Sequence, residues 1–174
     1  MLGYEESYGC LIAPFVRDKD GLQAITLYSE MANFYDKQGM SLDMVWEMMG
    51  KKYGYYLDIT YSLSFFGLSG EESMKKLMAT MHSNPFIKIN GMEVMEVEDF
   101  LSLKRFTKEK EEPIDLPKSD VVKRYFPGET YVVVRPSGTE PKVKFYIGVV
   151  GNSYEELPAK AESFYKELKK ILNL

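Results

Sequence analysis

The residues of this chain that best suit chemistry lie in a short polar loop between two runs of β-branched and aromatic residues. The runs at 131–134 and 143–149 predict a strand on each side of the loop. A guanidinium, hydroxyls, ammonium groups and free backbone amides suit a dianionic phosphate, because an arginine binds two oxygens at once and the smaller donors bind the rest. An ordinary hairpin with a surface arginine is the alternative that the residue types leave open. The polar groups come from Arg135, Ser137, Gly138, Thr139, Lys142 and Lys144.

The segment Arg135-Pro-Ser-Gly-Thr-Glu-Pro-Lys142 resembles the phosphate-binding loop in the last domain of the α-D-phosphohexomutases. That family includes the phosphoglucomutases, phosphomannomutases and phosphoglucosamine mutases. The resemblance implies that the loop holds the phosphate of a sugar substrate. The residues that it assigns to the substrate phosphate are Arg135, Ser137, Gly138, Thr139 and Lys144.

A second segment, Tyr4-Glu-Glu-Ser-Tyr-Gly9, is similar to the sugar-recognition loop in the third domain of the same family. A carboxylate and a hydroxyl two residues apart in an extended segment point the same way, so both can bond neighbouring sugar hydroxyls. The resemblance therefore implies that Glu5 and Ser7 contact the sugar. The form of the motif is most similar to the phosphoglucomutase branch, and a plain surface turn is the alternative.

Two motifs on which the family's reaction depends are not found in this chain. One is a loop resembling Ser-His-Asn-Pro, whose serine carries the transferred phosphate, and the other is an Asp-x-Asp-x-Asp-Arg loop that holds magnesium. Met81-His-Ser-Asn-Pro85 has its histidine and serine in the wrong order, and we expect His82 to end a helix. Arg17-Asp-Lys-Asp-Gly21 has only two carboxylates, and we expect Asp20 to cap a helix. We therefore expect no catalytic residue and no metal ligand here, with magnesium bound only by a longer parent enzyme.

The resemblance implies that this chain is the substrate-binding C-terminal portion of a phosphohexomutase, an isomerase of carbohydrate metabolism. Such an enzyme interconverts hexose 1-phosphate and 6-phosphate through a phosphoserine. The expected partners are a hexose phosphate and the N-terminal domains of the parent enzyme, and the chain alone is expected to be inactive. Two alternatives stay open: a non-catalytic phosphate-binding or interaction domain, and a mutase for mannose or glucosamine phosphates.

The composition is that of a folded chain with an acidic surface. Of 174 residues, 45% are hydrophobic and 14% aromatic, which is enough for a core. The formal net charge of −4 disfavours nucleic acid as a partner. No apolar run approaches the roughly 20 residues of a membrane span, so we expect a cytoplasmic protein. The single cysteine excludes an internal disulfide.

Periodicity and capping residues predict the order of the helices and strands. An Asn90-Gly91 pair predicts a two-residue hairpin turn, and the charged segment 108–120 predicts an exposed loop. A Ser153/Glu156 pair predicts a capping box for the last helix. Methionines at helical spacing, such as Met44, Met48, Met78 and Met81, are expected to fill the core. Helices are predicted over about 20–37, 41–52, 71–82 and 153–172, and strands over 11–16 and 56–66.

The predicted fold class is α+β. Residues 55–174 are expected to form a C-terminal antiparallel sheet flanked by helices, which the resemblance identifies as the phosphate-binding fourth domain. Residues 1–54 are expected to be a remnant of the sugar-recognition third domain, a partial α/β domain.

Overall fold

The computed structural model describes residues 2–4, 9–16, 18–67, 69–83 and 88–174. It divides into two compact units, Met1–Tyr55 and Tyr56–Leu174. The division falls next to the boundary that the sequence predicts between residues 54 and 55. Each unit is described by itself.

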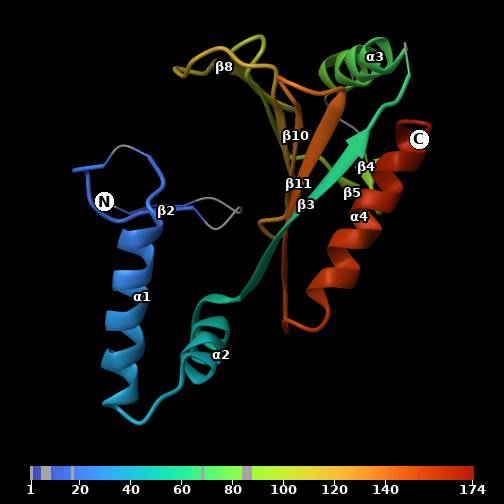
Figure 1. Ribbon diagram of the computed structural model, residues 1–174. Coiled ribbons are helices and arrows are strands. Elements are labelled where there is room, and N and C mark those ends of the chain that lie inside the picture. Colours follow the sequence, from blue (N-terminus) through green and yellow to red (C-terminus); the bar gives the residue numbers. More distant parts are fainter. Residues whose placement is uncertain (1, 5–8, 17, 68, 84–87) are drawn as a thin grey trace. The chain divides into compact units, whose positions relative to one another are not determined.

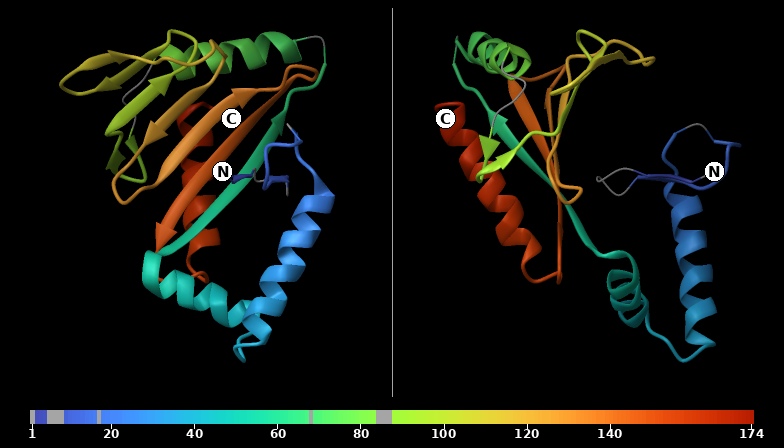
Figure 2. Two further views of the ribbon diagram at one scale, coloured as in Figure 1. Left: turned by 90° about the vertical axis from the view of Figure 1, so that its left-hand side faces the viewer. Right: turned by 180° about the vertical axis from the view of Figure 1, so that it is seen from behind.

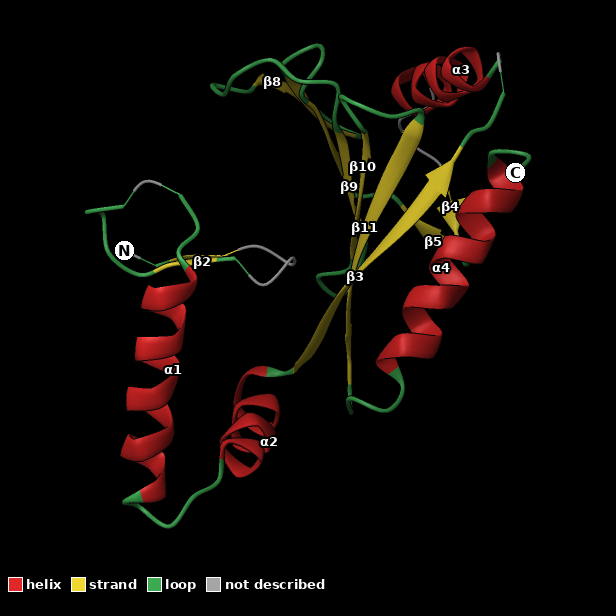
Figure 3. Cartoon of the chain, in the orientation of Figure 1, coloured by secondary structure: helices red, strands yellow, loops and turns green. Residues whose placement is uncertain are grey.

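The first unit contains a small two-stranded ladder and two helices (Figure 3). Both helices begin as predicted, since the Asp20 carboxylate accepts a hydrogen bond from the Leu22 N–H at 3.0 Å and the Ser41 hydroxyl accepts one from the Met44 N–H at 3.3 Å. The strand predicted over 11–16 is wrong beyond its first residue, because the chain turns at Pro14, which has no N–H to donate to a ladder. The elements are β1 (Gly3–Tyr4), β2 (Cys10–Leu11), α1 (Gly21–Asp36) and α2 (Leu42–Tyr53).

The apolar faces of α1 and α2 are largely exposed in this unit. Leu22 and Ile25 on α1 are 76% and 65% exposed. The prediction that Met44 and Met48 fill a core is wrong, since both are exposed on α2. Helical spacing alone indicates an apolar stripe, but a core also needs a second layer to cover that stripe.

The second unit is built on a seven-stranded sheet with the order β3-β11-β10-β9-β6-β7-β8 (Figure 1). The ladders that join β11 to β10, β10 to β9, β9 to β6, β6 to β7 and β7 to β8 are antiparallel. This agrees with the predicted α+β class. The strands are β3 (Tyr55–Ser64), β6 (Glu96–Asp99), β7 (Lys104–Thr107), β8 (Glu111–Pro113), β9 (Val122–Tyr125), β10 (Tyr131–Pro136) and β11 (Lys142–Gly151).

Two helices, α3 (Gly70–Ser83) and α4 (Leu157–Ile171), lie on the same side of this sheet (Figures 1 and 2). Alternate residues of the central strands point toward them and form the core. The predicted apolar stripe of the last helix is confirmed, because its inward side chains are fully buried. These core residues include Val132, Val134, Val143, Phe145 and Ile147 of the sheet and Leu157, Ala161, Phe164 and Leu168 of α4.

Several local features of the second unit test the sequence analysis. The hairpin turn is confirmed, since Asn90 and Gly91 have positive φ angles of 49° and 74° between β4 (Lys88–Ile89) and β5 (Met92–Glu93). The predicted capping box at the last helix is wrong, because Glu156 is the N-cap residue and makes no side-chain capping bond. The predicted exposed loop over 108–120 is wrong in part, because it contains β8 and the buried Ile114.

Candidate functional site

The loop between β10 and β11 is held in place at both ends. The Ser137 N–H donates to the Lys142 carbonyl at 2.7 Å, and the Lys142 N–H donates to the Glu140 carbonyl at 2.7 Å. The Phe65 N–H, just after β3, donates to the Pro141 carbonyl at 2.8 Å and so fixes the loop to a third strand. The sequence folds this way because β-branched residues extend both strands while Gly138 and two prolines shape the turn between them.

Three of the predicted phosphate-binding residues line one surface pocket of about 500 Å³. The Thr139 backbone N–H donates to the Ser137 hydroxyl at 3.4 Å, and this bond spans the turn at Gly138. A Cβ atom added at Gly138 would meet nothing within 4 Å, so a ligand can approach the backbone there. The pocket is lined by Gly67, Glu71, Met74, Ser137, Gly138, Thr139, Glu140 and Pro141.

Arg135 and Lys144 lie beside this loop but not in the lining of the pocket. They face each other across β10 and β11, so their side chains project from the same face of the sheet. Their strand neighbours Val134 and Phe145 are buried under the helices, which places both cations on the opposite face. Among the residues that the structure describes, the Arg135 side chain makes no hydrogen bond or ion pair, and its guanidinium is free to bind an anion. The Lys144 ammonium lies 5.9 Å from the centre of the Tyr146 ring.

The third cation of the predicted loop, Lys142, is already paired. The Lys142 ammonium lies 2.6 Å from a Glu140 carboxylate oxygen, and this hydrogen bond lowers the pKa of Glu140 below its ordinary value. The ammonium of Lys142 is therefore less available to a phosphate than the sequence suggests. Glu71, an acidic residue of the pocket wall, was not predicted, because it comes from α3 and no local pattern connects it to the loop.

The predicted sugar contacts Glu5 and Ser7 lie outside the described residues. Their role stays a prediction from the resemblance.

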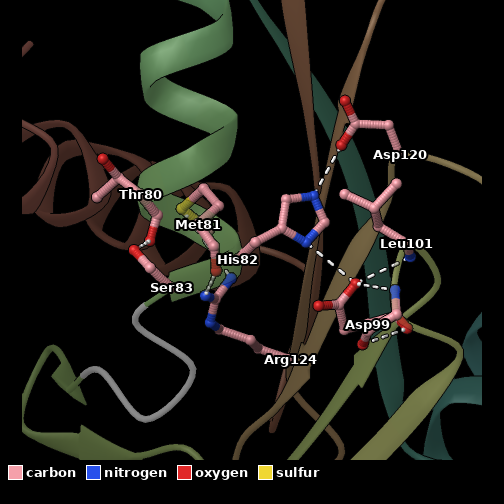
Figure 4. Close-up of polar contacts among 9 residues, drawn as sticks. Thr80, Met81, His82, Ser83, Asp99, Leu101, Asp120 and Arg124 are labelled. Carbon is pink, nitrogen blue, oxygen red and sulfur yellow. Dashed lines mark hydrogen bonds and ion pairs between the residues drawn. The ribbon is translucent and has the colours of Figure 1, made fainter.

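His82 sits at the end of α3, as predicted, and is bonded on both sides (Figure 4). Its Nδ1 atom lies 3.0 Å from Asp99 Oδ1, and its Nε2 atom lies 2.7 Å from Asp120 Oδ1. The cluster joins the end of α3 to β6 and to the segment before β9. No local pattern in the sequence indicates that Asp99 and Asp120 contact His82.

A buried cation, Arg124, lies next to the cluster of His82, Asp99 and Asp120. Arg124 is fully buried on β9 and donates to the Met81 carbonyl at the end of α3. Burial lowers the pKa of Arg124 to about 10, and the nearby charge of Asp99 acts in the opposite direction. These polar contacts stabilise the last turn of α3, where helix carbonyls lack partners within the helix.

In the described part of the chain, no group of three or more His, Cys, Asp or Glu side chains could hold a metal ion. Asp20, which belongs to the segment that partly imitates a magnesium loop, is used as a helix cap. None of the described helices has the length and apolar character needed to cross a membrane.

Comparison with known proteins gives a consistent result. Residues 89–166, which include the loop, match the family model described as phosphoglucomutase/phosphomannomutase, C-terminal domain. A phosphoglucomutase from Staphylococcus haemolyticus is 36% identical over 159 residues, which span 90% of this chain and 29% of that protein. One from Staphylococcus epidermidis is 35% identical over 162 residues, spanning 92% of this chain and 30% of that protein.

A solved structure has a similar fold along the whole chain. It is the open form of pp63/parafusin, a phosphoglucomutase from Paramecium, with a TM-score of 0.64 at 15% sequence identity. The match covers 99% of this chain and 30% of that protein. The chain therefore spans about 30% of the length of the relatives that it matches.

Proposed function

We propose that this chain is the C-terminal part of an α-D-phosphohexomutase of the phosphoglucomutase/phosphomannomutase type, and that its β10–β11 loop binds the phosphate of a hexose phosphate. The observation that carries the proposal is the joint placement of Ser137, Gly138 and Thr139 in one pocket. Hydroxyls and a sterically open backbone there provide neutral donors for phosphate oxygens.

The positive charge needed to bind a phosphate dianion comes from the two strands that flank the loop. Arg135 and Lys144 are paired across adjacent strands, so a phosphate over the loop can meet both cations together. A guanidinium binds two phosphate oxygens in one plane, while an ammonium acts as a point charge. The proposed phosphate site therefore consists of Arg135, Ser137, Gly138, Thr139 and Lys144.

In the proposed parent enzyme this loop positions the substrate and breaks no bond. Phosphate moves between the 1- and 6-positions through a phosphoserine, so each end of the sugar must in turn reach the same nucleophile. A remote site that binds the phosphate at the other end supplies binding energy and orientation for both half-reactions. Glu5 and Ser7 would contact the sugar from the third domain, with residues 55–174 forming the fourth domain.

The remaining chemistry is assigned to other parts of the parent. Magnesium would be bound there. The parent's preceding domains are the proposed partner of the first unit, and the exposed apolar face of α1 supports such a contact. We place the parent enzyme in the cytoplasm. Glucose phosphates are the favoured substrates, since the similar staphylococcal proteins are named phosphoglucomutases.

Titration of the 174-residue chain with inorganic phosphate, followed by amide NMR shifts, tests the proposal. The amides of Ser137, Gly138 and Thr139 should shift first, with a dissociation constant in the millimolar range, about 4 kcal/mol of binding. Arg135→Ala should weaken binding by about fivefold or more. The matched control is Lys166→Ala, which removes an exposed cation of α4 that pairs with Glu162. Shifts confined to another surface, or equal losses in both variants, would contradict the assignment.

A further inference from the structure

The seven-stranded sheet of the second unit has two unequal edges, β8 and β3 (Figure 1). β8 has only three residues, of which two are glutamates and the third is a proline. Short length, charge and proline are features by which edge strands avoid pairing with other chains. β3 has ten residues and carries a single charged side chain, Asp58. The β3 edge therefore lacks the features that protect the β8 edge.

The core of the second unit is also less complete beside β3. Its odd-numbered residues face α4, since the Tyr61 ring stacks on the Tyr165 ring of that helix with 4.2 Å between the ring centres. These inward residues of β3 are only partly buried, whereas those of β10 and β11 are fully buried. A further strand beside β3 would cover this apolar row, which consists of Leu57, Ile59, Tyr61 and Leu63.

The other face of β3 is polar. The Asp58 carboxylate accepts a hydrogen bond from the Tyr131 hydroxyl at 2.6 Å, and Tyr131 alternates with the buried Val132 on β10. The even-numbered residues of β3 therefore lie on the face of the sheet away from the helices. Ser62 lies on this face and is exposed. A carboxylate that accepts one hydrogen bond keeps further lone pairs, so Asp58 can accept another bond from a neighbouring strand.

We propose that β3 is an interaction surface for a second copy of this chain, and that the two β3 strands pair antiparallel about a two-fold axis at Thr60. Thr60 is the midpoint of residues 56–64, the part of β3 that belongs to the second unit. In this register Asp58 of each copy lies opposite Ser62 of the other copy, so no two carboxylates face each other. Because the contact is two-fold symmetric, each pair occurs twice. The inference does not depend on the phosphate role of the β10–β11 loop.

The same register also matches the apolar residues of the two copies. Leu57 lies opposite Leu63 of the second copy, and Ile59 lies opposite its Tyr61. Apolar pairs of this kind stabilise an antiparallel ladder, and like charges directly opposite each other would destabilise it. The partly buried row of β3 would thereby be covered on the side of α4. The order of residues along β3 is thus self-complementary, which favours a second copy as the partner.

The test measures the oligomeric state of the full 174-residue chain by sedimentation equilibrium. A contact one strand wide falls at the low end of interface sizes, so we expect a dimer with a dissociation constant of about 10–100 μM. Ser62→Lys places an ammonium opposite Asp58 of the second copy and should tighten the dimer about threefold or more. Ser62→Asp places a carboxylate there and should weaken the dimer about fivefold or more. Both effects should shrink at high salt, which screens exposed charges.

The matched controls are Ser119→Lys and Ser119→Asp, which make the same changes of charge at an exposed serine outside β3. Each control should change the dissociation constant less than twofold. Unchanged amide NMR signals of β10 and β11 would show that the variants are folded. A chain that stays monomeric well above the expected range overturns the proposal. A dimer that responds alike to the Ser62 and Ser119 variants also overturns it, because the contact would then lie on another surface.

Discussion

Replacing Asp99 by asparagine should destabilise the second unit near neutral pH. The Asp99 carboxylate is largely buried and accepts hydrogen bonds from the Leu101 N–H at 2.9 Å, the Ser102 N–H at 3.2 Å and His82 Nδ1 at 3.0 Å. An asparagine oxygen can keep the two backbone bonds, but it loses the negative charge of the carboxylate to which the backbone N–H groups and His82 are bonded. Hydrogen bonds to charged groups contribute about 1.5–3 kcal/mol, so Asp99→Asn should cost about 2 kcal/mol and Asp99→Ala about 3 kcal/mol or more.

The stabilisation by the Asp99 carboxylate should depend on pH in a defined direction. Burial of Asp99 raises its pKa, but the bonds from Ser102, His82 and Leu101 outweigh burial and leave the pKa below its ordinary value. Because the folded-state pKa is lowered, the stabilisation by this carboxylate is complete above the ordinary value of about 3.9. It is lost as the pH falls through the folded-state pKa. The difference between wild type and Asp99→Asn should therefore shrink in acid.

Urea unfolding followed by the amide NMR signals of β9 measures this effect, because β9 reports on the second unit alone. Asp115→Asn is the control, since Asp115 is exposed and should change the free energy of unfolding by less than about 0.5 kcal/mol. Equal stability of Asp99→Asn and wild type at neutral pH would refute the reasoning. A difference that grows as the pH falls would also refute it.

Three further predictions follow from the site and the sheet. The purified 174-residue chain should show no mutase activity in a coupled assay, and turnover clearly above a contamination control would overturn the assignment of the catalytic groups to the rest of the parent. In the full-length parent, Arg135→Ala should lose about 2–4 kcal/mol of transition-state stabilisation, measured as a fall in kcat/KM. Arg135→Lys should recover only part of this loss, because an ammonium lacks the planar fork of a guanidinium. Unchanged kinetics in both variants would exclude the phosphate role of Arg135. Gly148→Ala should destabilise the second unit by about 2 kcal/mol in urea unfolding, because the new methyl group would overlap the Tyr131 ring. The hydroxyl of that ring donates to Asp58 at 2.6 Å. A variant as stable as wild type would show that the ring can move without loss of stability.

The sequence predicted the parts of the fold that have local signatures. Strands β10 and β11 are β-branched runs on either side of a polar loop, and Asp20 and Ser41 are capping residues directly before their helices. The short strands β7 and β9 were missed because they are rich in charge. Arg124 is fully buried on β9, and no propensity or periodicity predicts a buried arginine.

In the candidate site, too, the residues with a local sequence signature were predicted and those that depend on distant contacts were not. Ser137, Gly138 and Thr139 were predicted together because they are consecutive in a recognisable loop, and the structure places them in one pocket. Glu71 and the pairing of His82 with Asp99 and Asp120 depend on contacts between distant elements. Such contacts are fixed by how strands and helices pack, so a local pattern of residue types cannot reveal them. The sequence likewise could not show that Lys142 would be engaged by its neighbour Glu140.

The order of strands in the sheet has a consequence for how the second unit folds. Its first strand, β3, neighbours its last strand, β11. Side-chain bonds across this part of the sheet, Tyr56 to Glu129 and Tyr131 to Asp58, each join residues 73 positions apart. Pairings so distant in sequence form slowly. During synthesis, β3 stays unpaired until β11 has left the ribosome. In that interval its segment, which contains tyrosines and a leucine, can associate with other chains.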